Sequence, residues 1–357
     1  MILHLILDEK FTTRIIEFMN QNYQNHVFIL YYKKALKYCD KIQKENVHLL
    51  NLEDSNFTLY MKLFEMADQI IIHSIFFPEI SRFFHHKKKL LKKAVFVIWG
   101  GDIYNDHIEK IKFKNPFKLI RHKYRLHLKY QLIHNIHTFM TFTYGDFDLV
   151  KKWYRTYGKG FDVLYPSTIN KEDLDKNATF KDSKITNIII GNSATPTNNH
   201  LEAFLAIEHF KNQCINIYCP LSYGDLEYGK KIAKIGKEKF GDKFIPIFDY
   251  MSPNQYAQLL SKMHIAIFAH NRQQATGNIE ILSYYGAKLY LKNDIATWSH
   301  YVERDHRKFF NFYDISKMSF DDFIEINESD KEDNKKYFEN IWDNNHVKKL
   351  WDAVLVK

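Results

Sequence analysis

Cysteine and repetitive sequence are both scarce in this chain of 357 residues. The three cysteines, Cys39, Cys214 and Cys219, include no closely spaced pair, which excludes a disulfide framework and predicts a reducing compartment. No low-complexity tract and no repeat of solenoid period occurs. Apolar residues make up 45% of the chain, so we expect a folded protein with a large core rather than a disordered one.

Long hydrophobic runs are also missing. No run approaches the roughly 18 apolar residues that a membrane-spanning helix needs. The first residues, MILHLILDEKFTTR, lack the basic start of a signal peptide and predict a first β-strand instead. We therefore expect a cytoplasmic protein without a membrane-spanning segment.

Acidic residues are scarce in one region only. Residues 82–129 contain 14 Lys and Arg but only three Asp and Glu. This region therefore accounts for the positive net charge of the whole chain, which is +9. This concentration predicts an anionic partner, and we expect an anionic membrane surface at the inner face of the cytoplasmic membrane. Insertion of Phe83, Phe84 or Phe117 is a second route to a bilayer, and a set of solvated helical faces is the structural alternative. No recognised nucleic-acid-binding motif occurs, so nucleic acid is not expected as a partner.

Apolar runs of strand length alternate with stretches of helical spacing along the chain. This alternation is typical of βαβ units and parallel sheets, and the pattern starts again after residue 184. We predict an α/β protein with one domain at 1–165, a polar linker at 166–184, a second domain at 185–333 and a long C-terminal helix at 334–357. Packing of that helix against the first domain is an option. The predicted strands are 2–7, 26–32, 46–52, 69–76, 94–100, 137–142, 185–192, 215–220, 243–248, 264–269 and 288–292.

Several familiar nucleotide and metal motifs are absent. No G-x-x-x-x-G-K-[ST] sequence occurs, and no G-x-G-x-x-G follows the first strand of either domain, which disfavours P-loop enzymes and dinucleotide dehydrogenases. One D-x-D pair, Asp146 and Asp148, offers a possible metal site, but its simpler interpretation is the start of a helix. We therefore expect no metal and no cofactor.

Polar side chains follow three predicted strands of the second domain. Gly191 begins a loop rich in Ser, Thr and Asn, Tyr223 lies in the next loop, and Arg272 begins a loop that opens a helix. Arg and helix N-termini bind phosphate oxygens, and ligands of parallel sheets bind beyond the carboxyl ends of the strands. Ordinary helix capping is the alternative for the first loop. The predicted ligand is a diphosphate-linked compound, and its predicted binding residues are Gly191, Asn192, Ser193, Tyr223, Arg272, Gln273, Gln274, Gly277 and Asn278.

The first domain offers one distinctive loop, VIWGGDIYND at 97–106. Gly100 and Gly101 follow a buried strand and present Asp102 at the carboxyl edge of the sheet, beside Trp99. A carboxylate opposite a diphosphate site suits a general base; a turn or capping role is the alternative for Asp102. His73, at the end of another strand, is the second candidate base or a phosphate-facing donor, with a purely structural role as its alternative.

The stretches VIWGGDIY, IIIGNSATPTNNH, YCPLSYG and NRQQATGNIEILSYYGAKLYLKND resemble the family 56 glycosyltransferases. The resemblance runs from His73 to about Trp298. It implies a GT-B fold, in which two Rossmann-like domains face each other across a cleft. The first domain would be the acceptor side, with Trp99, Gly100 and Gly101, and the second would bind the nucleotide sugar.

The resemblance also implies a reaction. A deoxy-amino sugar of the TDP-4-acetamido-4,6-dideoxyhexose type would pass from its nucleoside diphosphate to a polyprenyl-diphosphate-linked or surface glycan. Many retaining GT-B enzymes carry E-x7-E in this segment, but the eighth residue after Glu280 is Lys288, so that motif is absent. The alternatives are a fucosyltransferase that uses GDP-fucose on lipopolysaccharide, and a non-catalytic nucleotide- or nucleic-acid-binding protein.

Overall fold

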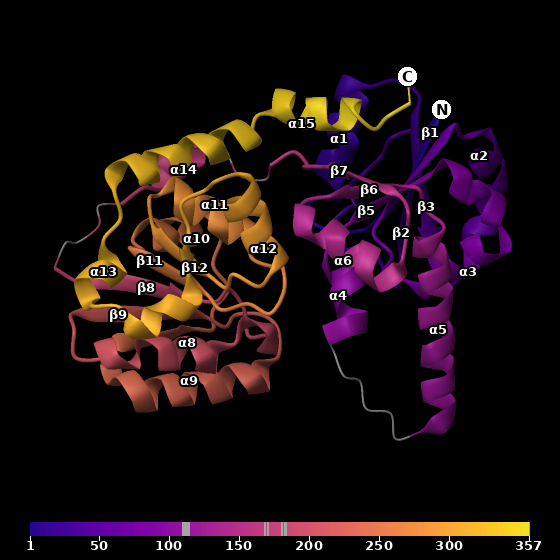
Figure 1. Cartoon of the computed structure of the whole chain (residues 1–357). Helices are drawn as coiled ribbons and strands as arrows, with labels where there is room; N and C mark the ends of the chain where they lie inside the picture. Colours follow the sequence, from indigo (N-terminus) through magenta and orange to yellow (C-terminus); the bar gives the residue numbers. More distant parts are fainter. Residues whose placement is uncertain (109–114, 168, 170, 180, 182–183, 357) are drawn as a thin grey trace. The chain divides into compact units, whose positions relative to one another are not determined.

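The computed structural model describes residues 1–108, 115–167, 169, 171–179, 181 and 184–356. The chain divides into two compact units (Figure 1). Unit 1 comprises Met1–Thr168 together with Asp343–Lys357, and unit 2 comprises Ile169–Trp342. None of the helices in the described part of the chain is both long enough and apolar enough to cross a bilayer.

Unit 1 is built on a parallel sheet of seven strands in the order β3-β2-β1-β4-β5-β6-β7. Every pair of neighbouring strands is parallel, as the alternation of strands and helices predicted. The strands are β1 (Ile2–Leu7), β2 (His26–Tyr32), β3 (Val47–Asn51), β4 (Gln69–His73), β5 (Ala94–Ile98), β6 (Thr138–Thr141) and β7 (Lys159–Asp162).

Alternate residues of these strands enter two separate cores, because successive side chains of a strand point to opposite faces. Leu3 and Leu5 belong to one core, whereas Ile2 and Ile6 belong to the other. The helices of unit 1 are α1 (Thr12–Asn22), α2 (Met61–Met66), α3 (Pro78–His86), α4 (Gly101–Ile108), α5 (Pro116–His134), α6 (Tyr144–Tyr154) and α15 (Asn344–Asp352).

Unit 2 is also built on a parallel sheet, which has six strands in the order β10-β9-β8-β11-β12-β13. The strands are β8 (Thr186–Ile190), β9 (Ile215–Pro220), β10 (Phe244–Ile247), β11 (Ile265–Phe268), β12 (Lys288–Leu291) and β13 (Phe310–Asn311). The helices are α7 (Lys171–Asn177), α8 (His200–Ile207), α9 (Leu226–Phe240), α10 (Pro253–Ser261), α11 (Thr276–Tyr284), α12 (Ala296–Trp298), α13 (Phe320–Ile324) and α14 (Glu328–Ile341).

The helices of unit 2 cover both faces of its sheet, α8 and α9 on one face and α10, α11 and α14 on the other (Figure 1). Ile188 and Ile190 of β8 pack in the core beneath the first pair of helices, and Ile189 packs in the core beneath the second group. Both sheets therefore have the strand order of a doubly wound fold, in which ligands bind beyond the carboxyl ends of the strands where the order reverses. That point lies between β1 and β4 in unit 1, and between β8 and β11 in unit 2.

The structure differs from the sequence prediction at three places. The polar stretch predicted as a linker contains α7, and Leu174 of this helix is buried against Ala257 and Tyr284 of unit 2. The single C-terminal helix is two helices, because the chain leaves the helical path after Trp342 and Asp343 caps α15 by accepting a hydrogen bond from the Asn345 amide. The edge strands β7 and β13 were not predicted, since they are only four and two residues long.

The two C-terminal helices belong to different units. Phe338 of α14 is buried in a core of unit 2, whereas Val347 and Trp351 of α15 are buried in a core of unit 1. The end of the chain does pack against the N-terminal domain, but only from Asp343 onward.

Candidate active site

The loops after β8, β9 and β11 meet at the carboxyl edge of the unit 2 sheet. Asn192 joins all three: its Nδ2 donates to the Tyr223 hydroxyl at 2.8 Å, and its Oδ1 accepts from Gln274 Nε2 at 3.0 Å. Gln274 in turn accepts a hydrogen bond from Thr197 at 2.7 Å. The structure thus brings together residues that the sequence predicts as one binding site, but the side-chain amide of Gln274 connects the loops rather than facing outward.

A buried polar layer beneath these loops holds their shape. The Asn198 Oδ1 accepts from the Asn192 amide at 2.9 Å and lies 3.1 Å from His270 Nε2. Gly191 has a φ of +68°, and a Cβ at this position would lie 2.7 Å from Asn198 Oδ1 and 2.8 Å from His200 Nε2. Glycine is therefore required both by the backbone conformation and by the close approach of this layer. Sequence reasoning missed Asn198, His200 and His270, because nothing in their spacing marks them as buried.

The helix α11 begins at this site with an uncapped N-terminus. Its N-cap residue, Ala275, has a left-handed conformation (φ +62°) and supplies no side-chain cap. A Cβ on Gly277 would meet no atom of the described residues within 4 Å, so this turn is open on that side. Asn278 donates to the Tyr256 hydroxyl at 2.7 Å and is thereby held in place. Amides of an uncapped helical turn attract anions.

Arg272 supplies the positive charge of the site. Its Nη1 donates to the carbonyl of Gln273 at 3.0 Å, which orients the guanidinium within the loop. Burial raises the pKa of the Tyr223 phenol, and the hydrogen bond from Asn192 and the charge of Arg272 partly offset that effect. The charge of Arg272 therefore acts on Tyr223, and the two side chains lie at the same edge of the sheet.

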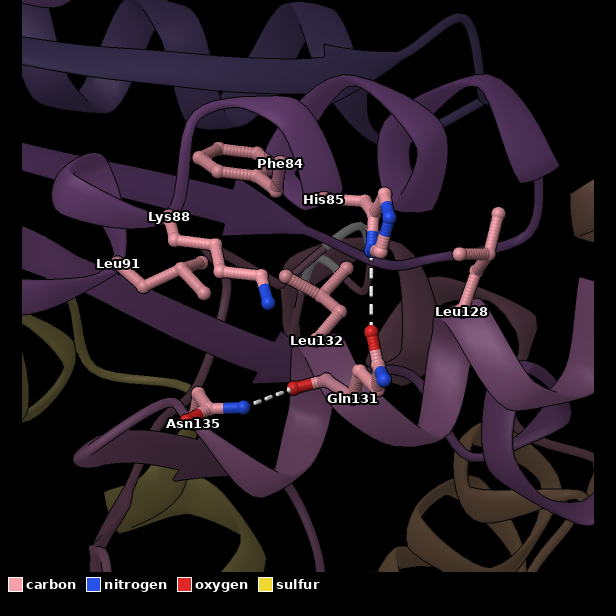
Figure 2. Close-up of a pocket in the computed structure, with 8 residues that line it drawn as sticks. All are labelled: Phe84, His85, Lys88, Leu91, Leu128, Gln131, Leu132 and Asn135. Carbon is pink, nitrogen blue, oxygen red and sulfur yellow. Dashed lines mark hydrogen bonds between the residues drawn. The ribbon is translucent and has the colours of Figure 1, made fainter.

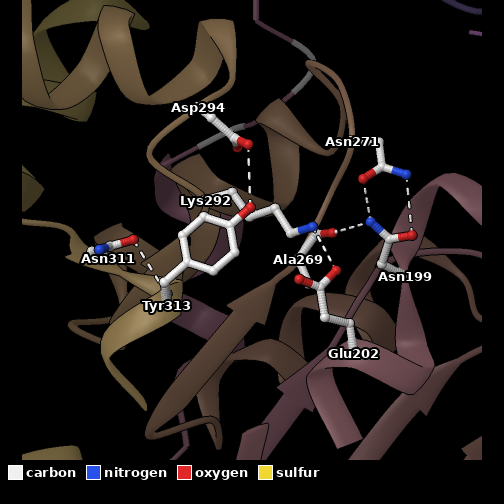
Figure 3. A network of polar contacts seen from close by, with 8 residues as sticks. All are labelled: Asn199, Glu202, Ala269, Asn271, Lys292, Asp294, Asn311 and Tyr313. Atoms are coloured by element: carbon white, nitrogen blue, oxygen red, sulfur yellow. Dashed lines mark hydrogen bonds and ion pairs between the residues drawn. The ribbon is translucent and has the colours of Figure 1, made fainter. Parts of the chain in front are cut away.

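A second network lies beside the loop after β11 (Figure 3). Asn199 donates to the carbonyl of Ala269 at 2.9 Å and accepts from Asn271 at 3.1 Å. Next to it, the almost buried ammonium of Lys292 lies 2.5 Å from the Glu202 carboxylate. Lys292 follows β12, so a fourth loop carries a basic residue to the same edge of the sheet. Sequence reasoning did not select Lys292, because a lysine after a strand is usually a solvated residue.

Glu280 lies within α11 and is partly buried. Its carboxylate accepts a hydrogen bond from the Trp342 indole at 2.8 Å, and burial raises its pKa from 4.5 to about 7. Lys288, where an E-x7-E motif would have its second glutamate, is buried and donates to the carbonyl of Asp322 at 2.5 Å. Lys288 therefore has a structural role in unit 2, and Glu280 is held by Trp342 of the same unit.

Glu280→Gln is expected to stabilise unit 2 at alkaline pH. Between pH 4.5 and about 7 the unfolded chain ionises at Glu280 while the folded protein keeps the proton, so the stability of the wild type falls as pH rises. Glutamine accepts the Trp342 hydrogen bond without ionising. The variant should gain up to about 3 kcal/mol in free energy of unfolding at pH 8 and almost nothing at pH 4.5. Urea unfolding at both pH values measures this free energy, and the exposed Glu227→Gln is the control. An equal change in the free energy of unfolding of wild type and Glu280→Gln between the two pH values would contradict the prediction.

In unit 1, aromatic side chains gather beyond the carboxyl ends of β1, β4 and β5. The Trp99 ring packs edge-on against Phe11 at 4.7 Å between centroids, and Phe76 lies 6.1 Å from it. Gly100 has a φ of +84°, and a Cβ on Gly101 would touch the Phe76 ring at 3.3 Å. Trp99 thus forms part of an apolar wall, and the two glycines let the backbone turn closely beneath it.

Asp102 lies inside this loop cluster rather than at its surface. Its side chain is buried, and its two oxygens accept hydrogen bonds from the amides of Ile75 and Trp99, each at 3.2 Å. Burial raises the pKa of Asp102 to about 6 despite the nearby Lys129. This geometry joins the loops after β4 and β5, which is the turn role that stood as the alternative to catalysis for Asp102.

His73 is likewise buried, in a chain of histidines across the sheet. Its Nε2 lies 2.9 Å from His4 Nδ1, and His4 Nε2 lies 2.8 Å from His26 Nδ1. The other nitrogen of His73 pairs with the Tyr165 hydroxyl, which accepts from the Trp99 indole at 3.0 Å. Burial lowers the pKa of His73 to about 3. With both nitrogens in hydrogen bonds and no exposed surface, the imidazole has a structural role in this conformation.

Glu9 is a partly exposed carboxylate at the same edge, and sequence reasoning missed it. It follows β1, at the point where the strand order reverses, and adjoins Phe11 of the aromatic wall within the same loop. Partial burial raises its pKa, partly offset by the Lys10 amide. Its neighbour Asp8 is buried and accepts from the Cys39 amide at 3.0 Å. The reversal of strand order in a parallel sheet, combined with two successive acidic residues after the first strand, is the signal that would have drawn attention to Glu9.

The Asp146 and Asp148 pair opens α6, as the simpler interpretation predicted. Asp146 is buried and accepts from the Tyr104 hydroxyl at 2.5 Å, whereas Asp148 is half exposed and pairs with Lys151 at 2.6 Å. The described residues contain no group of three or more His, Cys, Asp or Glu arranged to hold a metal ion.

Comparison with solved structures identifies proteins with a related fold. The trehalose-6-phosphate synthase of E. coli bound with UDP-2-fluoro glucose has a TM-score of 0.63 at 11% identity, with 100% of both chains covered. A glycosyltransferase from Rickettsia africae has a TM-score of 0.65 at 13% identity, with 99% of this chain and 97% of that chain covered. The trehalose-6-phosphate synthases are GT-B enzymes, and the matches extend over both units, so this chain has the GT-B fold.

A family model provides the remaining finding. The model described as 4-alpha-L-fucosyltransferase, glycosyl transferase group 56, matches residues 61–325. This range includes all of the loops described above except that of Glu9, and most of both units. The chain therefore belongs to glycosyl transferase group 56 and is a glycosyltransferase.

Proposed function

We propose that unit 2 binds a nucleoside diphosphate sugar and that its sugar passes to a glycan acceptor bound by unit 1. The observation that carries this proposal is the convergence of three loops, through Asn192, beside Arg272 and the uncapped start of α11. A cation and helical amides together suit a diphosphate. The related fold in E. coli was solved with UDP-2-fluoro glucose, which supports a nucleotide sugar as the donor.

The donor sugar that we propose is a deoxyhexose. The family description names an L-fucosyltransferase, and fucose is a 6-deoxy sugar. Within this class we propose a TDP-linked 4-acetamido-4,6-dideoxyhexose and a polyprenyl-diphosphate-linked or surface glycan as acceptor. GDP-fucose as donor and lipopolysaccharide as acceptor form the alternative.

A thermal-shift panel of TDP, UDP, GDP, CMP and their sugars tests the donor. A ligand that binds only the folded protein raises its melting temperature as concentration exceeds Kd. We expect the largest shift with TDP or its sugars; a shift confined to GDP and GDP-fucose supports the alternative. Binding without turnover of any donor and acceptor pair would favour a non-catalytic nucleotide-binding protein.

Transfer is expected to proceed in excess EDTA. In this proposal Arg272 and the first amides of α11 stabilise the charge of the leaving diphosphate, which is the function that a divalent ion has in other transferases. The measurement is the rate of transfer with EDTA and after return of Mg²⁺ or Mn²⁺. Complete loss with EDTA, restored by the metal, would instead favour a metal site and make Asp146 and Asp148 the residues to test.

For the general base we propose Glu9 in place of Asp102 and His73. An acceptor hydroxyl needs a group that it can reach, and Glu9 is partly exposed, whereas the other two side chains are buried with their polar atoms in hydrogen bonds. Asp102 is then a positioning residue that holds the loop of Trp99. We retain an anionic membrane surface as a proposed partner, at the inner face of the cytoplasmic membrane.

A further inference from the structure

The helix α5 has a firmly packed C-terminal half. Leu128, Leu132 and Ile133 are buried, and His85 of α3 lies 3.0 Å from the Gln131 side chain (Figure 2). The small hollow between α3 and α5 has room for about one water molecule, so it serves packing rather than binding. This contact anchors the helix to unit 1.

The N-terminal half of α5 is exposed on all sides. Every residue from 115 to 121 is exposed, and the helix continues past its contact with α3 into solvent (Figure 1). The exposed residues include large apolar ones: Phe117 is 79% exposed, Ile120 is 64% exposed and Tyr124 is 54% exposed. Phe83 and Phe84, which the sequence also offered for insertion into a bilayer, are buried in the core instead.

The apolar and basic residues of this half form an ordered pattern. Phe117, Ile120 and Tyr124 are three and four residues apart, so they lie on one face of the helix. Lys118, Arg121, Lys123 and Arg125 flank that face, all exposed, and α5 contains no Asp or Glu. An apolar face between basic flanks is the pattern of a helix that lies in a membrane interface.

We propose that the N-terminal half of α5 docks unit 1 on an anionic lipid surface, with Phe117, Ile120 and Tyr124 inserted among the acyl chains. The flanking Lys and Arg would contact lipid phosphates, since their long side chains reach past the apolar face. The inference rests on the proposed function in one respect: docking would bring the enzyme to a lipid-linked acceptor. Docking itself is independent of turnover. Lys110, Lys112 and Lys114 lie outside the described residues and form no part of it.

Two other occupants fit the helix less well. A second copy of the chain would bring two strongly basic helices together, and like charges repel. Nucleic acid phosphates could pair with the basic residues, but such contacts would leave the apolar side chains of Phe117 and Ile120 exposed to water. A bilayer with anionic headgroups satisfies both the charge and the apolar face.

Co-sedimentation with vesicles of phosphatidylcholine, with or without phosphatidylglycerol, tests the proposal on the full chain. Wild type should bind the anionic vesicles in a salt-sensitive manner and the neutral ones at least about tenfold more weakly. The triple variant Phe117→Gln, Ile120→Gln, Tyr124→Gln keeps every charge. Its partition coefficient into anionic vesicles should be lower than that of wild type by about tenfold or more, because the three apolar side chains no longer contribute to binding.

The matched control is Leu205→Gln, which alters a leucine on α8 of unit 2 that is 62% exposed. It should bind vesicles as wild type does. Wild-type binding by the triple variant, or equal binding of wild type to neutral vesicles, would overturn the proposal, as would a preference for RNA over vesicles in competition. Nucleotide-induced thermal shifts measured on the same variants report the donor site separately, so failure of docking and failure of the proposed function are distinguishable.

Discussion

Glu9→Gln is expected to lower the rate of sugar transfer by about 10²–10⁴-fold. An acceptor hydroxyl is a weak nucleophile at neutral pH and benefits from losing its proton as the new bond forms. Glutamine keeps the size of the side chain but cannot take that proton. Since Glu9 belongs to unit 1 and the donor loops belong to unit 2, the affinity for the nucleotide should stay near that of wild type. Initial rates and calorimetric titration with nucleotide measure the two quantities.

The pH profile separates a base from a structural residue. If Glu9 is the base, kcat of the wild type falls as pH drops through the raised pKa of Glu9, and the Glu9→Gln variant lacks this acidic limb. A rate for Glu9→Gln within about threefold of wild type would remove the assignment.

Asp102→Asn is the matched comparison in unit 1. The asparagine side chain has one oxygen, so it can accept from only one of the two backbone amides, Ile75 or Trp99. Its NH₂ group would then face the N–H of the second amide. The expected cost is about 1–3 kcal/mol in stability, seen as a lower melting temperature and a higher KM for acceptor. If this variant instead loses about 10²–10⁴-fold in kcat at wild-type stability, Asp102 is the base that the sequence predicted.

Stereochemistry provides an independent test. A general base that activates the acceptor hydroxyl implies a single displacement, which inverts the anomeric carbon. A product that keeps the anomeric configuration of the donor would contradict direct displacement whatever the variants show.

Arg272→Ala is expected to weaken nucleotide binding by about tenfold or more. A charge-assisted hydrogen bond contributes about 1.5–3 kcal/mol, and about 1.4 kcal/mol corresponds to tenfold in Kd. Arg272→Lys keeps the charge but loses the two-pronged contact, so its affinity should fall between those of wild type and Arg272→Ala. Calorimetry with TDP measures all three proteins.

The surface variant Lys230→Ala serves as control, because it removes a positive charge from α9 of the same unit. It should bind nucleotide as wild type does. Unchanged affinity of a folded Arg272→Ala variant would show that the phosphates bind elsewhere, and Lys292 after β12 would then be the next residue to test.

The layout of both sheets could be predicted from sequence because it depends on local periodicity. Alternating apolar residues in β1 and β8 enter opposite cores, and the intervening helices force neighbouring strands to be parallel. Parallel strands bring their following loops to one edge. Because Asn192, Tyr223 and Arg272 each follow a strand, their common location at that edge could be predicted from their positions along the chain.

The individual roles within those loops were not predictable in the same way. Gln274 has the same donors whether it faces a ligand or Asn192, and only the neighbouring loop decides between the two. Asp102 and His73 follow strands as a base would, but the amides of Ile75 and Trp99 and the ring of His4 cover them.

By itself, then, the sequence determined the fold class, the edge of each sheet at which loops meet, and the basic charge of α5. These depend on residue type and on spacing along the chain, which the sequence contains directly. Only the tertiary structure decided that Glu9 stays partly exposed, that Phe84 is buried while Phe117 is not, and that the chain breaks its final helix after Trp342. Burial and hydrogen-bond pairing depend on which distant residues cover a side chain, and those neighbours are brought together only by folding.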